Sequence, residues 1–207
     1  MAAMTTTTAS SIGSQRASLA SLVRSGGSAR AIAAHLDSLA PYSRVQEVTS
    51  LGGALVGKLY DAVAGNEPLT LEDFVPASET GTVIFEGKNS LPAFTHFQKR
   101  FARVGDVVIG YNHQTMSFAT GPGYFVVRNA TAGESHPDEL FFDYTTEPPR
   151  GWPSDWPAYK PNTAGLSRAV YANMKDFCRR VANGVLVGKA FKSGVSQGAY
   201  FTLTRPV

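Results

Sequence analysis

The chain has 207 residues, of which 43% are hydrophobic, 11% are aromatic and 17% are charged. This length fits one domain with a well-filled core, and so few charges suit a sheet that curls around a cavity or a surface that a partner covers. The net charge is +3, and the lysines and arginines are scattered along the chain. Nucleic-acid-binding proteins concentrate such charges on one face, so we expect no nucleic-acid partner.

Neither an internal disulfide nor a membrane span is expected. Cys178 is the single cysteine, and no apolar run approaches the roughly 18 residues needed to cross a bilayer. We therefore expect a cytoplasmic protein. The first 36 residues contain no Asp or Glu, which fits an organelle transit peptide, but a low-complexity tail is the simpler interpretation. The expected organisation is a flexible tail over residues 1–15 and one domain over residues 16–207.

The first third of the chain predicts helices. Residues 29–39 form a short one, and residues 45–63 form a longer one because their apolar side chains recur at spacings of three and four. Gly52 and Gly53 in the middle of the longer helix mark a kink or a close approach of another element. A capping box that begins at Thr70 opens one further helical turn.

From residue 82 onward the apolar pattern changes to a period of two, in segments bounded by glycines and turn residues. Short joints between these segments predict consecutive hairpins and therefore an antiparallel sheet. Apolar residues at helical spacing over 166–181 predict one helix before the last two strands. The predicted strands cover residues 82–86, 106–111, 116–120, 124–130, 139–146, 185–191 and 200–205.

Three segments carry a resemblance to a known family: Gly81-Thr-Val-Ile-Phe-Glu-Gly87, Phe97-Gln-Lys-Arg-Phe101 and the terminal aromatic run from Tyr200 to Pro206. Their order resembles small, largely uncharacterised bacterial proteins with a G-x-W-x-G strand, a later Gly-Lys-Arg-Phe strand and a terminal aromatic strand. Phe85 stands at the family's Trp position, and Gln98 stands where the family has the Gly of its Gly-Lys-Arg-Phe strand.

That family is similar in architecture to calycin or lipocalin-like β-barrels, so the resemblance implies a barrel able to hold an apolar ligand. It also implies a strand over residues 97–101. The spacing of Phe94, Phe97 and Phe101 predicts a helix there instead, and both alternatives stay open for residues 92–102. The expected fold is α+β: an antiparallel curved sheet or small calycin-like barrel with N-terminal helices and one helix before the last two strands.

The sequence lacks the motifs of metal and cofactor chemistry. The four histidines have no metal-ligand spacing, and the lone cysteine excludes a cysteine-based zinc site. There is no phosphate-binding loop, no dinucleotide fingerprint and no nucleophile elbow. We therefore expect neither a metal nor a cofactor.

Three residues are candidates for catalysis. His113 titrates near neutral pH and shares a strand face with Tyr111, although a turn histidine is the plainer interpretation. Asp143 alternates onto the face of Phe141, where an inward carboxylate would have its pKa raised by burial. The alternative for Asp143 is a salt bridge to Arg128 or Lys189.

Aromatic side chains and one arginine are candidates for ligand binding. An inward Arg128 could hold a ligand carboxylate, whereas an outward one would only solvate a strand. Trp152 and Trp156 lie in a proline-rich segment that could cover the mouth of the barrel or a sheet edge. The candidate ligand-binding residues are Phe85, Phe97, Tyr124, Arg128, Phe141, Trp152, Trp156 and Tyr200.

Three functions fit these features. The first is a barrel that binds an apolar small molecule. The second is a cofactor-independent cyclase or isomerase that acts on an apolar substrate in the same cavity, with His113, Asp143 or a tyrosine moving a proton. The third is a protein-interaction module with a filled core. The sequence favours the first.

Overall fold

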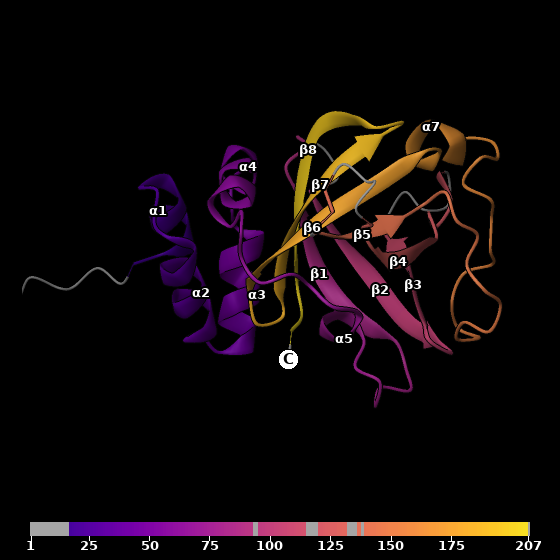
Figure 1. The fold of residues 1–207 in the computed structure, drawn as a ribbon, viewed down its shortest axis with the longest axis horizontal. Coiled ribbons are helices and arrows are strands. Elements are labelled where there is room, and N and C mark those ends of the chain that lie inside the picture. The colour runs from indigo at the N-terminus through magenta and orange to yellow at the C-terminus, as the bar shows by residue number, and fades with distance from the viewer. Residues whose placement is uncertain (1–16, 93–94, 115–119, 132–135, 138, 207) are drawn as a thin grey trace, which may run out of the picture.

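The computed structural model describes residues 17–92, 95–114, 120–131, 136–137 and 139–206. Eight antiparallel strands form a closed barrel in which each strand pairs with its neighbours along the chain and the last pairs with the first (Figure 1). The expected α+β chain with an antiparallel barrel is confirmed at this level. The strands are β1 (Val83–Asn89), β2 (His96–Val104), β3 (Val107–His113), β4 (Phe125–Asn129), β5 (Leu140–Asp143), β6 (Met174–Ala182), β7 (Val185–Lys192) and β8 (Val195–Thr204).

Every second side chain along the strands points into the barrel and fills it. Val83 and Phe85 of β1 belong to the apolar cluster inside it, where Phe101 of β2 and Phe125 of β4 meet with ring centroids 5.7 Å apart. Successive side chains of a strand point to opposite faces, so every second residue is free to pack outside. The outer residues are buried as well, because helices and loops cover much of the wall.

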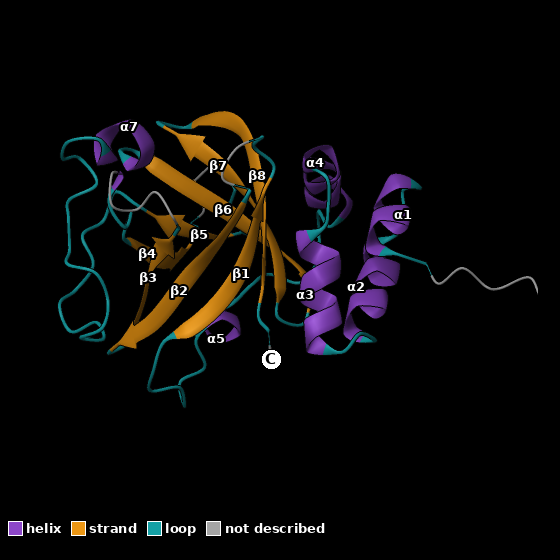
Figure 2. Cartoon of the chain, turned by 180° about the vertical axis from the view of Figure 1, so that it is seen from behind, coloured by secondary structure: helices purple, strands orange, loops and turns teal. Residues whose placement is uncertain are grey.

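Four helices form a layer on the outside of β6, β7 and β8 (Figure 2). Leu59 of this layer lies in one buried cluster with Val181 and Val187 of the barrel wall. The helices are α1 (Leu19–Arg24), α2 (Ala29–Asp37), α3 (Pro41–Thr49) and α4 (Gly53–Ala62).

The glycine pair predicted to interrupt a long helix separates α3 from α4. A Cβ atom at Gly53 would collide with the backbone oxygen of Ser90, which follows β1. The expectation of a kink or close approach is therefore confirmed, and the single helix over residues 45–63 is wrong because the chain turns at residues 50–52.

The two ends of the barrel differ. At one end α5 (Leu71–Phe74) inserts the Phe74 ring, whose centroid lies 5.3 Å from that of Phe101. The backbone N–H of Thr70 donates to the Asp73 carboxylate at 2.6 Å and fixes the start of this turn. At the other end lies α7 (Ser167–Tyr171). Apolar side chains close the α5 end, so any cavity lies toward α7.

Two segments differ from the sequence-based expectation. The helix over 166–181 is wrong: α7 spans only Ser167–Tyr171, and β6 follows, so three strands come after the helix. Residues 96–104 form strand β2, so the helical interpretation of this segment is wrong and the strand interpretation is confirmed. The strand expected over 116–120 and the tail over 1–15 fall mainly or wholly outside the described residues.

Candidate functional site

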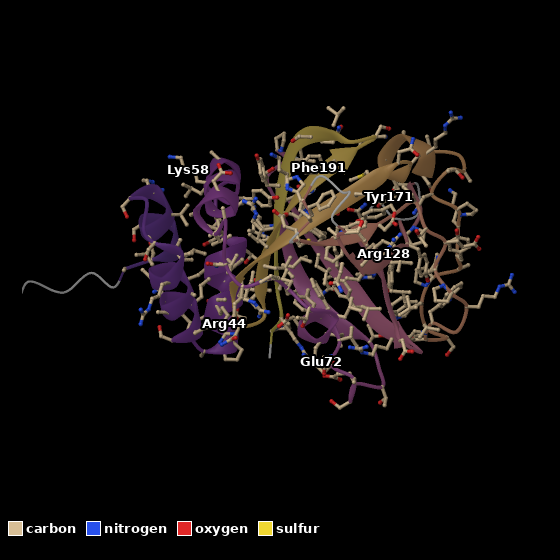
Figure 3. All side chains as sticks on the ribbon, viewed as in Figure 1. Arg44, Lys58, Glu72, Arg128, Tyr171 and Phe191 are labelled. Atoms are coloured by element: carbon tan, nitrogen blue, oxygen red, sulfur yellow. The ribbon has the colours of Figure 1, made fainter. Side chains whose placement is uncertain are left out.

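A pocket of about 160 Å³ lies inside the barrel at its α7 end. Its apolar lining includes Phe97 of β2 and Phe201 of β8, and Tyr171, which Figure 3 labels, also lines it. Below it the barrel is packed with phenylalanine rings. The polar residues lining the pocket are Asn89, Lys99, Asn112, Gln114, Tyr144, Tyr171 and Asp176.

Lys99 forms the centre of this polar group. It is only 3% exposed, because it lies between Phe97 and Phe101 on the inner face of β2. Its ammonium donates to Asn112 Oδ1 at 2.7 Å and to the Tyr144 hydroxyl at 2.5 Å. A third hydrogen bond, of 3.3 Å, reaches Asp176 Oδ2 and makes a buried ion pair.

Five aromatic rings surround the same ammonium. The Lys99 Nζ atom lies between 4.8 and 5.9 Å from the centroids of Phe97, Phe125, Phe142, Tyr144 and Phe201. The faces of such rings attract a cation, most strongly where water is excluded. The rings and the three oxygen acceptors together hold a charged group inside an apolar barrel.

Asp176 of β6 has an incomplete set of partners. Its Oδ2 atom accepts from Lys99 and, at 3.1 Å, from the Tyr144 hydroxyl. Its Oδ1 atom is buried and has no hydrogen-bond partner among the described residues. Because Asp176 lines the pocket, this oxygen leaves an acceptor site available to a ligand.

Burial dominates the electrostatics of the group. It lowers the pKa of Lys99 and raises the pKa of Asp176, although the attraction between the two opposes both shifts. Burial and the nearby Asp176 also raise the pKa of Tyr144, which keeps its hydroxyl protonated. Whether or not the proton moves from Lys99 to Asp176, the pair carries no net charge.

Tyr171 of α7 extends the group toward the mouth. Its ring stacks on that of Tyr144 with centroids 5.5 Å apart and planes 5° from parallel. The Gln114 side chain donates to the Tyr171 hydroxyl at 3.2 Å. A flat aromatic wall therefore lies beside the polar floor.

The predicted catalytic residues lie outside the barrel. Tyr111 packs on the outer wall, with its ring centroid 4.8 Å from that of Trp156, and His113 is exposed at the end of β3. Asp143 forms a 3.0 Å ion pair with Arg128, the salt bridge that stood as the alternative to an inward carboxylate.

The predicted ligand-binding residues are divided between the two faces. Only Phe85 and Phe97 face the interior, and only Phe97 lines the pocket. Phe141 packs outside against Phe177, Tyr200 packs against Tyr60 of α4, and Arg128 is exposed.

The proline-rich segment covers the wall rather than the mouth. Trp156 donates to Thr82 Oγ1 at 2.8 Å, which holds it toward the α5 end. Trp152 and Trp156 pack around Tyr124, whose hydroxyl donates to the Pro157 carbonyl at 2.7 Å. The expected lid over the mouth is therefore wrong, and the alternative of a loop that covers the sheet is the one observed.

Sequence reasoning missed Lys99, Asn112, Tyr144 and Asp176 as a group. A signal was present, since Lys99 alternates with Phe97 and Phe101 and would face inward in a strand. This signal was not decisive, because residues 92–102 fitted either a helix or a strand. Asp176 was assigned to the helix expected over 166–181, whereas it lies on β6.

A second hollow, of about 560 Å³, lies where the ends of β3 and β4 meet the segment around Thr146. It is larger and more open than the pocket at Lys99. None of its described lining side chains is a buried polar group without a partner. The pocket at Lys99 is therefore the stronger candidate.

Comparison with protein-family models, with curated proteins and with solved structures found no match. Within the described part of the chain, no three His, Cys, Asp or Glu side chains gather as metal ligands. No described helix is both long and apolar enough to cross a membrane. The site must therefore be interpreted from its own geometry.

Proposed function

We propose that the chain binds a small, mainly apolar and uncharged molecule in the barrel, with a hydrogen-bond donor of the ligand placed on Asp176. The supporting observation is the buried Asp176 Oδ1 atom, which has no partner among the described residues and borders the pocket. A buried acceptor left unpaired costs about 1–3 kcal/mol, so a donor from a ligand would recover stability there.

The volume limits the size of the ligand. A cavity of about 150 Å³ in another protein accommodates benzene, whereas drug-sized pockets begin near about 300 Å³. The 160 Å³ pocket therefore matches one ring with a short substituent. A longer ligand would extend out past Leu91 and Val170, which line the opening.

Charge balance selects the head group. Asp176 already neutralises Lys99, so a ligand carboxylate would bring an uncompensated negative charge into a buried site. An alcohol brings no charge and donates to Asp176. The site therefore favours neutral hydroxyl compounds over fatty or aromatic acids.

Three ring compounds test the proposal: benzyl alcohol, toluene and benzoate. Titration calorimetry and ligand-observed NMR should detect benzyl alcohol binding about tenfold or more tightly than toluene, with benzoate weakest. Ala190→Leu adds bulk to the pocket wall and should abolish binding, while Ala34→Leu adds the same bulk on the exposed face of α2 and should not.

Two outcomes would count against the proposal. One is benzoate binding best, which would mean that Lys99 acts as an unpaired cation. The other is equal binding by the Ala190→Leu variant with unchanged thermal unfolding, which would place the ligand elsewhere.

A cofactor-independent isomerase is the second candidate, favoured by the raised pKa of Asp176 beside the Lys99 and Tyr144 donors. Asp176 would remove a proton from the carbon between a ketone and an isolated double bond. The electron pair would move to the carbonyl oxygen, which would be stabilised by Lys99 or Tyr144. Return of the proton to the far carbon would give the conjugated ketone.

The test for this activity is conversion of 3-cyclohexenone to 2-cyclohexenone, followed by ultraviolet absorbance. Asp176→Asn should lower the rate at least about 100-fold, and Ala34→Leu should leave it unchanged. No conversion by a protein that binds benzyl alcohol would leave binding as the function.

A further inference from the structure

Exposed apolar side chains gather at the mouth of the barrel. Among the described residues, five large hydrophobic side chains are exposed, and one of them, Tyr42, lies on α3. The other four lie at the end of the barrel that carries α7: Leu91 (45% exposed), Leu166 (63%), Val170 (38%) and Val195 (65%).

Three short segments carry these four side chains. Leu91 follows β1 and lines the pocket together with Val170 of α7. Val195 begins β8, just beyond a tight turn that joins it to β7. The Lys192 ammonium donates to the Ala169 carbonyl at 2.6 Å and ties this hairpin to α7. Figure 1 shows the hairpin of β7 and β8 beside α7. The apolar tips therefore surround one opening.

The charge at this end has a single sign. Among the described residues at this end (88–92, 95–96, 112–114, 120–124, 166–175 and 190–200) there is no Asp or Glu. Asp143, which ends β5, and Asp176, which follows Lys175 on β6, are buried and paired with Arg128 and Lys99. The basic residues of these segments are Lys88, Arg168, Lys175 and Lys192.

We propose that this mouth docks on an anionic lipid bilayer, with Leu166 and Val195 inserted among the head groups and the basic side chains on the lipid phosphates. Apolar tips combined with basic side chains are the pattern that binds anionic interfaces. The pocket opening then faces the lipid, from which an apolar ligand enters without crossing water. This surface goes beyond the proposed function, and the two side chains placed in the lipid, Leu166 and Val195, do not line the pocket.

A second copy of the chain fits this face poorly, because two basic mouths would repel each other. A lipid surface with anionic head groups matches the charge of the mouth.

Vesicle co-sedimentation of the full chain tests the proposal. The protein should pellet with vesicles of equal parts phosphatidylcholine and phosphatidylglycerol, but not with pure phosphatidylcholine, and added salt should release it. Leu166→Ser combined with Val195→Ser should weaken binding at least about tenfold. Arg168→Gln alone should weaken it about fivefold.

Tyr42→Ser is the matched control, since it removes an exposed aromatic ring from the helical layer and should leave vesicle binding unchanged. Thermal unfolding and benzyl alcohol binding of the double serine variant should equal those of the wild type, which separates this proposal from the proposed function. Three results would overturn the proposal. The first is equal binding to both vesicle types, and the second is no binding to either. The third is a dimer in solution that the double serine variant dissociates.

Discussion

Burial of Lys99 and Asp176 inside an apolar barrel carries a large free-energy cost of desolvation. Both are 3% exposed, and their ion pair is 3.3 Å long. Each charge loses its hydration on burial. The Lys99 ammonium is compensated by Asp176, by the Asn112 and Tyr144 oxygens and by the aromatic rings. The Asp176 carboxylate is compensated by Lys99 and the Tyr144 hydroxyl. Removal of one partner should therefore cost far more than removal of both.

Lys99→Met should lower the free energy of unfolding by about 3–5 kcal/mol, because it leaves Asp176 buried without its cation. Asp176→Asn should also destabilise. The double variant should lose clearly less than the sum of the single losses, as measured by urea unfolding of all four proteins. The more exposed pair Arg103–Glu72 is the control, with a coupling below about 1 kcal/mol. Additive losses at Lys99 and Asp176 would contradict a coupled pair.

Asp143 gives the molecule an acid-dependent part of its stability. Burial alone would raise its pKa, but hydrogen bonds from Thr145 and Thr146 and the charge of Lys175 outweigh burial and hold it below the usual value. Its contribution is therefore complete above the unfolded-state pKa near about 3.9 and is lost as the pH falls through the lower folded-state pKa.

Asp143→Asn should lower the free energy of unfolding by roughly 2 kcal/mol at neutral pH. The difference from the wild type should shrink below about pH 4, where the wild-type carboxyl becomes protonated. Urea unfolding at neutral pH and at steps below that value measures both curves. A constant difference down to acid denaturation would refute the assignment.

Glycines inside the strands let phenylalanine rings lie flat in a narrow barrel. Gly110 of β3 lies under the ring of Phe125, and a Cβ atom there would come within 2.6 Å of that ring. Gly188 of β7 has the same relation to Phe201. These positions save the space that the large side chains need.

Gly110→Ala should cost about 1–3 kcal/mol, because the new methyl group forces the Phe125 ring or the strand to move. Phe125→Leu in the same chain should recover part of this loss. Gly81→Ala is the control, since nothing lies within 4 Å of its new methyl group. Differential scanning calorimetry of the variants compares them, and equal losses at Gly110 and Gly81 would show that ring contact is irrelevant.

The elements that sequence patterns predicted well are those whose ends are clearly marked by glycines, prolines or turn residues. The capping box at Thr70 and the strands near residues 83, 107, 125 and 185 were of this kind. Residues 174–182 failed because no glycine or proline separates them from the preceding helix and both faces of β6 are buried: Cys178 points inward, whereas Phe177 and Val181 pack outside. Apolar residues on both faces mask a period of two and mimic a helix.

The candidate site was hidden for a different reason. Strand periodicity indicates which residues share a face, but not which face points inward. Asp143 and Tyr111 lie on the outer face. Helices and loops bury this face almost as fully as the interior, so apolar neighbours do not distinguish the two faces in the sequence. Only the closed barrel reveals that Lys99, Asn112, Tyr144 and Asp176, which come from four separate segments, meet in one place.

At the scale of the whole molecule, the two tryptophans report on the outer wall rather than on the pocket. Both pack against Tyr124, and Trp156 also contacts Tyr111. Saturating benzyl alcohol should therefore leave the tryptophan emission spectrum unchanged, whereas urea unfolding should shift it. A ligand-induced shift in the wild type that persists in Ala190→Leu would mean a site beside the tryptophan loop.

The pairing of β1 with β8 affects how the protein folds during its synthesis. Its register joins Glu86 to Thr204 and Asn89 to Phe201, so the two edges that close the barrel are far apart in the chain. A growing chain cannot make this contact until its last strand has left the ribosome. Until then β1 is an unpaired edge, open to pairing with another nascent chain. Closure is thus a late, long-range step, and we expect the N-terminal helices to form before it.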